Sequence, residues 1–242
     1  MRVMWNTVKY RLQCYFKGYT FVMPFIVICI FLRFMYSIKP QEIVSSYLVS
    51  VQVLFLIMVW VGMMEINREN RVMEQIIELR VRKTWVYFAG KMLFLFILSI
   101  FMATICMIWP FVQNVIEHGT FFERKYIPED FLNSFILLLG SSFSGVMLGA
   151  LFHPDIFKDR KVAIALTVLL ALLADIREIV VSSQPILKYV LWPLPNIAYA
   201  AMQYGNEEYF KINLSLCYFL ILMVYAVTYG IIGSFLQYKR RA

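Results

Sequence analysis

Few residues of this chain are suited to covalent chemistry. Serines and glycines gather in the stretch SSFSG at residues 141–145, and the only histidines are His118 and His153. A hydrolytic serine needs a base within hydrogen-bond reach. His118 belongs to a polar connection, and His153 lies at the far end of the apolar run that holds the serines. We therefore predict no catalytic residue, and we expect these small residues to pack helices together.

The sequence also argues against a nucleotide or metal site. A phosphate-binding loop needs an upstream glycine before Gly-Lys and a Ser or Thr after it. Gly90-Lys91 has neither, since Met92 follows it. The four cysteines form no C-x-x-C pair, which favours small apolar side chains over metal ligands or disulfides; they are Cys14, Cys29, Cys106 and Cys217. We expect no cofactor or metal on this chain.

The remaining candidate site is the charged stretch 65–91, which separates two apolar runs. Ten of its 27 residues are charged, six of them basic and four acidic. Apolar residues recur there at helical spacing, with the acids among them; they are Val72, Met73, Ile76, Ile77 and Leu79. A helix that lies on lipid is usually strongly basic. The segment therefore predicts an amphipathic helix that contacts a protein partner.

Apolar runs define the elements that must hold this segment. The chain is 61% hydrophobic and 16% charged, whereas a globular domain has about 45–50% and 25%. Five runs are long enough to cross a bilayer, namely 20–38, 44–64, 92–111, 131–152 and 212–236. A sixth, 162–181, carries Asp175, Arg177 and Glu178 near one end, where headgroups or a watery cavity can solvate them. We predict an all-α integral membrane protein, 1–242, with six transmembrane helices.

Three further segments have their own patterns. Residues 1–19 place Trp5, Val8 and Leu12 at helical spacing, which favours an interfacial helix over an unstructured leader. The basic residues Lys9, Arg11 and Lys17 are expected elsewhere around that helix. Residues 182–211 combine three prolines with many aromatics, which predicts short re-entrant helices at the outer surface. Gly145 and Gly149 form a small-xxx-small pair that should pack against another span.

The distribution of basic residues predicts the orientation. Lys and Arg number 16 in the connections on the side of the N-terminus and 6 on the opposite side, where Arg177 near the end of the sixth run is counted. Because basic residues gather on the cytoplasmic side, both termini are predicted to be cytoplasmic in a multi-pass plasma-membrane protein. Anionic lipid and topology then account for the net charge of +8, and no nucleic-acid partner is expected.

The chain as a whole resembles the type 2 permeases of ATP-binding-cassette exporters. The shared features are six spans, an N-terminal interface helix, a cytoplasmic acidic helix and a proline-rich stretch before the last span. Five residues fit the family pattern around the acidic helix, namely Glu69, Glu74, Thr84, Gly90 and Lys91. The family often has Gly-Thr between the acids and Pro before the Ser or Thr, where this chain has Arg71-Val72 and Arg82-Lys83.

The resemblance implies a transport mechanism. The helix in 65–91 would be the coupling helix, held by a separate ATP-binding-cassette ATPase subunit that binds ATP and Mg. The residues implied in that contact are Glu69, Glu74, Ile76, Ile77, Glu78 and Arg80. A second permease copy, identical or related, would complete a pathway that moves an amphipathic peptide, a drug or a lipid-like molecule outward.

Charged residues within the spans are candidates for that pathway; they are Arg33, Asp175, Arg177 and Glu178. Arg33 could instead reach headgroups from the end of its span, and the other three could simply mark an outer helix end. A different class of function stays open as well, namely a non-transporting membrane scaffold or sensor that binds a cytoplasmic partner. A secondary transporter is disfavoured because acids near the midplane are few and no inverted repeat is visible.

Overall fold

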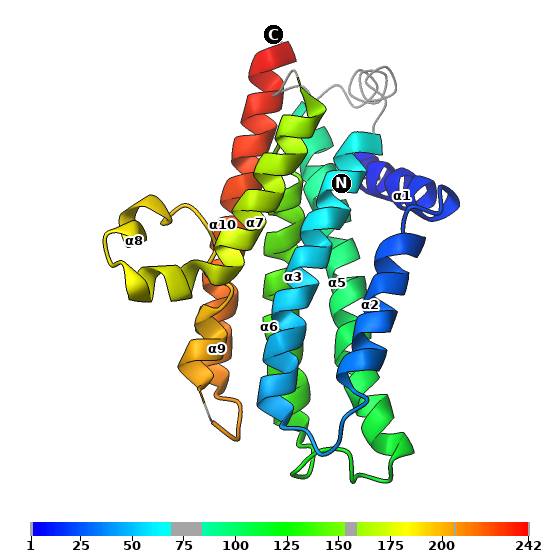
Figure 1. The fold of residues 1–242 in the computed structure, drawn as a ribbon. Coiled ribbons are helices and arrows are strands. Elements are labelled where there is room, and N and C mark those ends of the chain that lie inside the picture. Colours follow the sequence, from blue (N-terminus) through cyan, green and yellow to red (C-terminus); the bar gives the residue numbers. More distant parts are fainter. Residues whose placement is uncertain (1, 69–83, 153–158, 206, 242) are drawn as a thin grey trace.

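A computed structural model describes residues 2–68, 84–152, 159–205 and 207–241. Regular structure in these residues is helical, and one isolated bridge joins Gln41 to Phe122. The helices are α1 (Arg2–Lys17), α2 (Val22–Met35), α3 (Ile43–Arg68), α5 (Thr84–Ile116), α6 (Pro128–Gly149), α7 (Arg160–Ser183), α8 (Leu187–Val190), α9 (Tyr199–Tyr204) and α10 (Ile212–Arg241). The long helices run side by side as a bundle, as Figure 1 shows.

Four of the helices are long and apolar enough to cross a bilayer, which confirms a membrane-embedded, all-helical protein. They are α3, α5, α6 and α10. The predicted span 20–38 is shorter than expected, because α2 has only 14 residues. It is long enough to cross a bilayer only together with α1, from which it is bent by 71°. The predicted span 162–181 lies in α7. This helix is not among the four apolar enough to cross a bilayer, because Asp175, Arg177 and Glu178 interrupt its apolar stretch. The described helices thus support four or five spans.

Helix α6 lies at the centre of the bundle and packs against α3, α5 and α10. Small residues allow this, because the backbones of α3 and α6 come very close. A Cβ atom added to Gly145 would lie 2.6 Å from the carbonyl oxygen of Phe55, and one added to Gly149 would overlap that of Val59. The Ser141 hydroxyl donates to the carbonyl of Val51 over 2.7 Å. The prediction that this face of the fourth apolar run packs against another helix is confirmed.

Helix α1 lies across one end of the bundle, which we call the α1 end (Figure 1). Both described ends of the chain are found there, and the opposite end carries the connection 117–127, so we call it the loop end. Val8 and Tyr15 of α1 are buried against the bundle, whereas Trp5 is exposed. The helical prediction for 1–19 is therefore confirmed. The expected position of Arg11 is wrong, because Arg11 lies on the buried face, one turn from Val8 and Tyr15.

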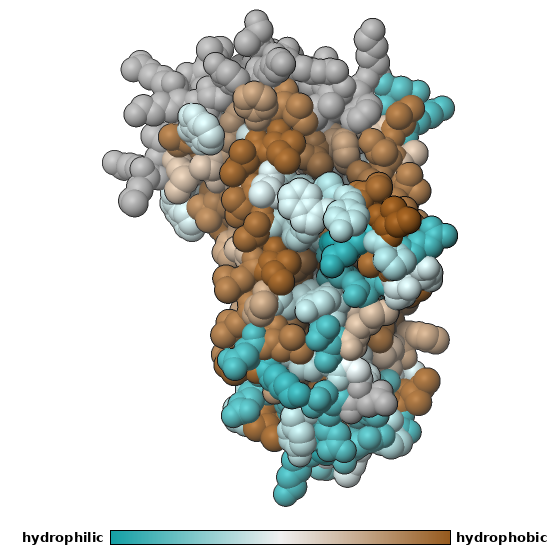
Figure 2. All heavy atoms as spheres, turned by 90° about the vertical axis from the view of Figure 1, so that its left-hand side faces the viewer, coloured by the Kyte–Doolittle hydropathy of each residue, from teal (hydrophilic) through white to brown (hydrophobic). Residues whose placement is uncertain are grey.

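The face of the bundle that carries α8 is largely apolar. Figure 2 shows apolar side chains over most of its upper part, a small hydrophilic group part-way down and a hydrophilic lower end. Exposed apolar residues include Leu169 and Leu172 of α7 and Leu220 and Val224 of α10. An apolar surface of this extent suits contact with lipid or with another membrane protein.

The crossing of α3 and α6 predicts a sharp difference between two glycines. Gly149→Ala should destabilise the protein by about 2 kcal/mol or more, because the added methyl group forces two backbones apart. Gly233→Ala in α10 is the matched control, since the nearest atom to its added Cβ lies 3.8 Å away and alanine favours the helix. The measurement is the melting temperature in detergent, and equal values for both variants would contradict the packing.

Candidate functional site

The predicted coupling residues lie outside the described residues. They are Glu69, Glu74, Ile76, Ile77, Glu78 and Arg80. Their two flanks are described: α3 ends at Arg68 and α5 begins at Thr84. Both flanks lie at the α1 end of the bundle, beside α1 itself (Figure 1).

Buried charged and polar groups join α1 to these two flanks. Arg11 of α1 approaches Glu65 near the end of α3, with 3.9 Å between Nη1 and Oε1. Its Nη2 donates to the Tyr87 hydroxyl of α5 over 2.8 Å, and its guanidinium lies 5.3 Å from the centre of the Tyr87 ring. We call Arg11, Glu65 and Tyr87 the α1 clamp.

The family-like pair Gly90-Lys91 lies close to the clamp. A Cβ added to Gly90 would lie 3.5 Å from the Cβ of Thr7, so α5 and α1 are in direct contact there. Lys91 is buried and lines a cavity of about 30 Å³ between α5, α6 and α10. That volume holds about one water molecule, so this cavity alone is too small for a substrate.

Two of the predicted pathway residues hold the irregular segment 191–198. Arg177 of α7 is buried and donates to the carbonyl of Leu194 over 2.6 Å. Glu178 accepts a hydrogen bond from the Asn196 side chain. Two of the three charges that interrupt α7 are therefore used inside the protein, which removes much of the cost of placing them in an apolar helix.

Three tyrosines of α10 hold the same segment. The Tyr218 hydroxyl donates to the carbonyl of Ile197 over 2.9 Å, that of Tyr225 to Trp192 over 2.8 Å, and that of Tyr229 to Pro193. Prolines in this segment lack an N–H and break the helical hydrogen-bond pattern. With Arg177, side chains thus satisfy four of its carbonyls, which allows irregular backbone within a membrane protein. The prediction of short helices in 182–211 is confirmed by α8 and α9.

The other two predicted pathway residues have different surroundings. Asp175 of α7 is partly buried, and its Oδ1 has no hydrogen-bond partner among the described residues. Arg33 is exposed in the last turn of α2. That position fits the snorkelling interpretation, in which the guanidinium reaches a headgroup.

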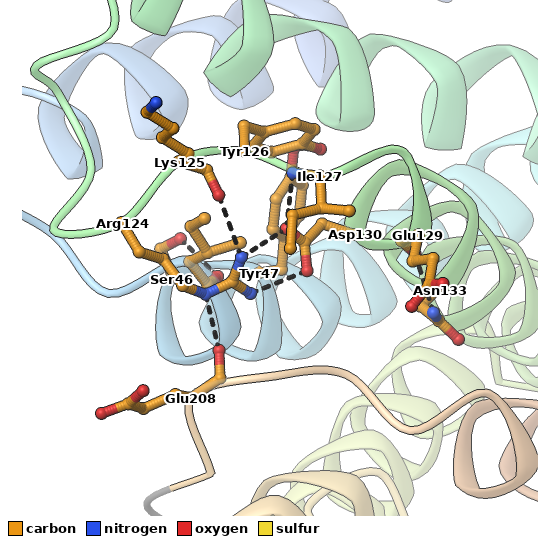
Figure 3. Close-up of polar contacts among 11 residues, drawn as sticks. Ser46, Tyr47, Arg124, Lys125, Tyr126, Ile127, Glu129, Asp130, Asn133 and Glu208 are labelled. Atoms are coloured by element: carbon orange, nitrogen blue, oxygen red, sulfur yellow. Dashed lines mark hydrogen bonds and ion pairs between the residues drawn. The ribbon is translucent and has the colours of Figure 1, made fainter.

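A second polar cluster ties the connections together at the loop end, and Figure 3 shows it in detail. Arg124 binds Asp130 at the start of α6 through two hydrogen bonds of 2.7 Å each. Its Nε donates to the carbonyl of Glu208 over 2.8 Å, and its guanidinium lies 4.3 Å from the ring centre of Tyr209. We call Arg124, Asp130, Glu208 and Tyr209 the loop clasp.

The loop clasp is a strong electrostatic contact. Hydrogen bonding to Asp130 raises the pKa of the Arg124 guanidinium above its ordinary value, and paired hydrogen bonds between arginine and a carboxylate are among the strongest in proteins. Asp130 also accepts from the backbone N–H of Ile127 over 3.0 Å and so caps α6. Asp130 thus fixes the start of the central helix directly, and it holds the connection from α9 to α10 through Arg124.

The serines of SSFSG have structural partners. Ser142 donates to the carbonyl of Leu139 over 3.0 Å, and Ser144 to that of Ser141 over 2.9 Å. A serine hydroxyl within a helix can donate to a carbonyl one turn earlier, which satisfies its polar group locally. These contacts agree with the structural role that we assigned to the serines.

Sequence reasoning missed several of these residues. Tyr218, Tyr225 and Tyr229 are spaced by seven and four positions, which places them on one face of a helix. That spacing was the available signal, but tyrosine is also common at membrane surfaces. Arg124 and Asp130 had no comparable signal, since both lie in a stretch of the sequence that is rich in charges.

Comparison of the chain with protein-family models, curated proteins and solved structures gives no match. The functional interpretation therefore rests on the residues and geometry described above.

The tyrosine contacts predict a difference between two identical substitutions. Tyr218→Phe removes a buried donor and leaves the Ile197 carbonyl without it, which should destabilise the protein by about 1–3 kcal/mol. Tyr189→Phe, at a side chain that is 85% exposed, is the control and should have little effect. Thermal unfolding in detergent measures both, and an unchanged melting temperature for Tyr218→Phe would contradict the assigned role.

The loop clasp predicts that arginine cannot be replaced by lysine. Arg124→Lys keeps the charge but loses the paired geometry, and we expect a loss of about 1–3 kcal/mol. We also expect faster proteolysis within 205–211, because the Glu208 carbonyl loses its donor. Lys125→Arg, at the exposed neighbouring residue, is the control. Equal proteolysis rates for the two variants would mean that the clasp does not hold this segment.

Proposed function

We propose that the chain is the transmembrane subunit of an ATP-driven exporter of the ATP-binding-cassette class. Two permease copies would form the pathway, and separate ATPase subunits would bind ATP and Mg. The cargo would be an amphipathic peptide, a drug or a lipid-like molecule that moves outward. The chain would supply the pathway and the contact with the ATPase, while the partner would hydrolyse ATP.

One observation supports this proposal most. The two described flanks of the charged segment 65–91 lie at one end of the bundle (Figure 1), and α1 joins both of them through Arg11, Glu65 and Tyr87. A segment that only tethered a partner would not need two buried polar contacts at its base. A segment that transmits movement needs a rigid attachment, because flexible flanks would absorb the displacement.

The packing inside the bundle gives such a movement a route. Both α3 and α5, which flank the segment, pack on the central helix α6. Since α6 also packs on α10, a displacement at the α1 end reaches the helix that holds the irregular segment 191–198. Packed helices transmit strain because their interiors are dense and have few voids.

The complete topology belongs to the same proposal. Helices α2 and α7 would complete six spans, with the α1 end in the cytoplasm and the protein in the plasma membrane. The excess of basic residues on that side supports the orientation. In α7, the contacts of Arg177 and Glu178 with the segment 191–198 support a membrane position, because they solvate charges that lipid would not.

Among the four pathway candidates, Asp175 is the one that we retain as a direct contact with cargo. Its Oδ1 has no hydrogen-bond partner among the described residues. Arg177, by contrast, holds the Leu194 carbonyl, and Glu178 holds the Asn196 side chain. A buried polar group without a partner is costly, and a passing polar or cationic group would satisfy it.

The energetic requirement on the ATPase contact is specific. A partner shifts a conformational equilibrium only if it binds the two states with different free energies. The ATPase must therefore hold the 65–91 segment differently before and after ATP binding. The acidic residues Glu69 and Glu74 are the first candidates for that difference, because the family resemblance implies both of them in the contact with the ATPase.

The test of this proposal co-expresses the chain with a candidate ATP-binding-cassette ATPase subunit, chosen from the genes that neighbour its own. Glu69→Arg combined with Glu74→Arg should reduce co-purification of the ATPase and its transport-coupled rate by about tenfold or more, since like charges at an interface are strongly unfavourable. Glu123→Arg, at an exposed side chain of the loop end, is the matched control. A complex that forms and turns over normally with both glutamates reversed would remove the coupling assignment and favour a scaffold or sensor.

A further inference from the structure

We propose that Arg11 is a positioning residue, which clamps helix α1 to both flanks of the 65–91 segment and makes α1, the end of α3 and the start of α5 one rigid base for it. The existence of this base is independent of what the segment binds. Its role in coupling rests on the function proposed above, so the two are tested by separate measurements.

The geometry of Arg11 carries the inference. One guanidinium nitrogen faces Glu65 at 3.9 Å, and another donates to the Tyr87 hydroxyl at 2.8 Å. The three residues come from three helices, at sequence positions that precede and follow the charged segment. A single side chain therefore joins both sides of the loop to a third element.

Burial makes this contact more than a surface ion pair. Arg11 is 5% exposed, Glu65 is 1% exposed and Tyr87 is fully buried. Exposed ion pairs contribute little because water and salt compete with them. A buried arginine without its partners would leave a charge in an apolar site, so separation of α1 from the flanks is strongly unfavourable.

The packing around Arg11 fixes the position of α1 along α5. Val8 and Tyr15 are buried on the same face of α1 as Arg11, and the Tyr15 ring lies 6.0 Å from that of Phe94 in α5. Thr7 lies against Gly90, one turn of α1 before Arg11. Apolar contacts thus set the register, while Arg11 strengthens the contact with α5 through Tyr87 and adds a link to α3 through Glu65.

The close approach of α1 to α5 offers a direct reporter. A Cβ at position 90 would lie 3.5 Å from the Cβ of Thr7, within the range of about 3.5–4.5 Å that a disulfide requires. Thr7→Cys with Gly90→Cys should therefore form a disulfide readily in a chain whose four native cysteines are replaced by alanine.

The first measurement is the rate of that disulfide in membranes, with copper phenanthroline as oxidant. Adding Arg11→Met should slow its formation about tenfold, because α1 then separates from α5 more often. Lys9→Met is the control: it removes one charge from an exposed position of the same helix and should leave the rate unchanged. If Arg11→Met does not fold, Glu65→Gln with Tyr87→Phe removes the same contacts with little change of shape. Unchanged rates in the variant that folds would overturn the proposal.

The second measurement tests positioning against general stability. In complex with the ATPase, Arg11→Met should bind the partner but lose several-fold of the coupled rate. When Thr7→Cys and Gly90→Cys are added to that variant, formation of the disulfide between positions 7 and 90 should restore the rate. A reductant should abolish the recovery, since the covalent bond replaces the link between α1 and α5. A rate that stays low after the disulfide has formed would refute the positioning role. If the ATPase fails to bind the unaltered protein, the proposed function is wrong, and the disulfide rates alone decide whether the base exists.

Discussion

The close contact between the backbones of α3 and α6 is the constraint on which the rest of the structure depends. Gly145 and Gly149 present no side chain to the carbonyl oxygens of Phe55 and Val59, so the two helices approach more closely than larger residues allow. This contact makes α6 the centre of the bundle. Helices α5 and α10 then pack on its other faces.

A second constraint comes from the backbone, which must keep its hydrogen bonds in an apolar environment. The prolines of 191–198 prevent a continuous helix there, so the backbone of this segment cannot satisfy its own carbonyls. Four of these carbonyls accept hydrogen bonds from side chains instead. Tyr218, Tyr225, Tyr229 and Arg177 supply them. The irregular segment is therefore part of the packed structure, and any movement of α10 relative to α7 must carry it along or break these bonds.

The two ends of the bundle are organised by arginines with opposite surroundings. At the α1 end Arg11 is buried and joins three helices. At the loop end Arg124 is partly exposed and joins connections to the start of α6 through Asp130. Both sites use the geometry of a planar guanidinium, which can bind several acceptors and lie over an aromatic ring. Helix α6 connects the two, because it begins at the loop clasp and packs on α3 and α5, two of the three helices of the α1 clamp.

The sequence by itself determined the long apolar helices in 44–64, 92–111, 131–152 and 212–236, the N-terminal helix and the packing face around Gly145, because hydropathy and side-chain size act over one or two helical turns. It placed Arg11 on the wrong face of α1, overestimated the length of α2 and gave no sign of the loop clasp. Only the tertiary structure decided those features. Arg11 and Tyr87 are 76 positions apart, and Arg124 and the Glu208 carbonyl are 84 apart. Such contacts depend on how helices are brought together in space, and no local pattern of residues contains that information.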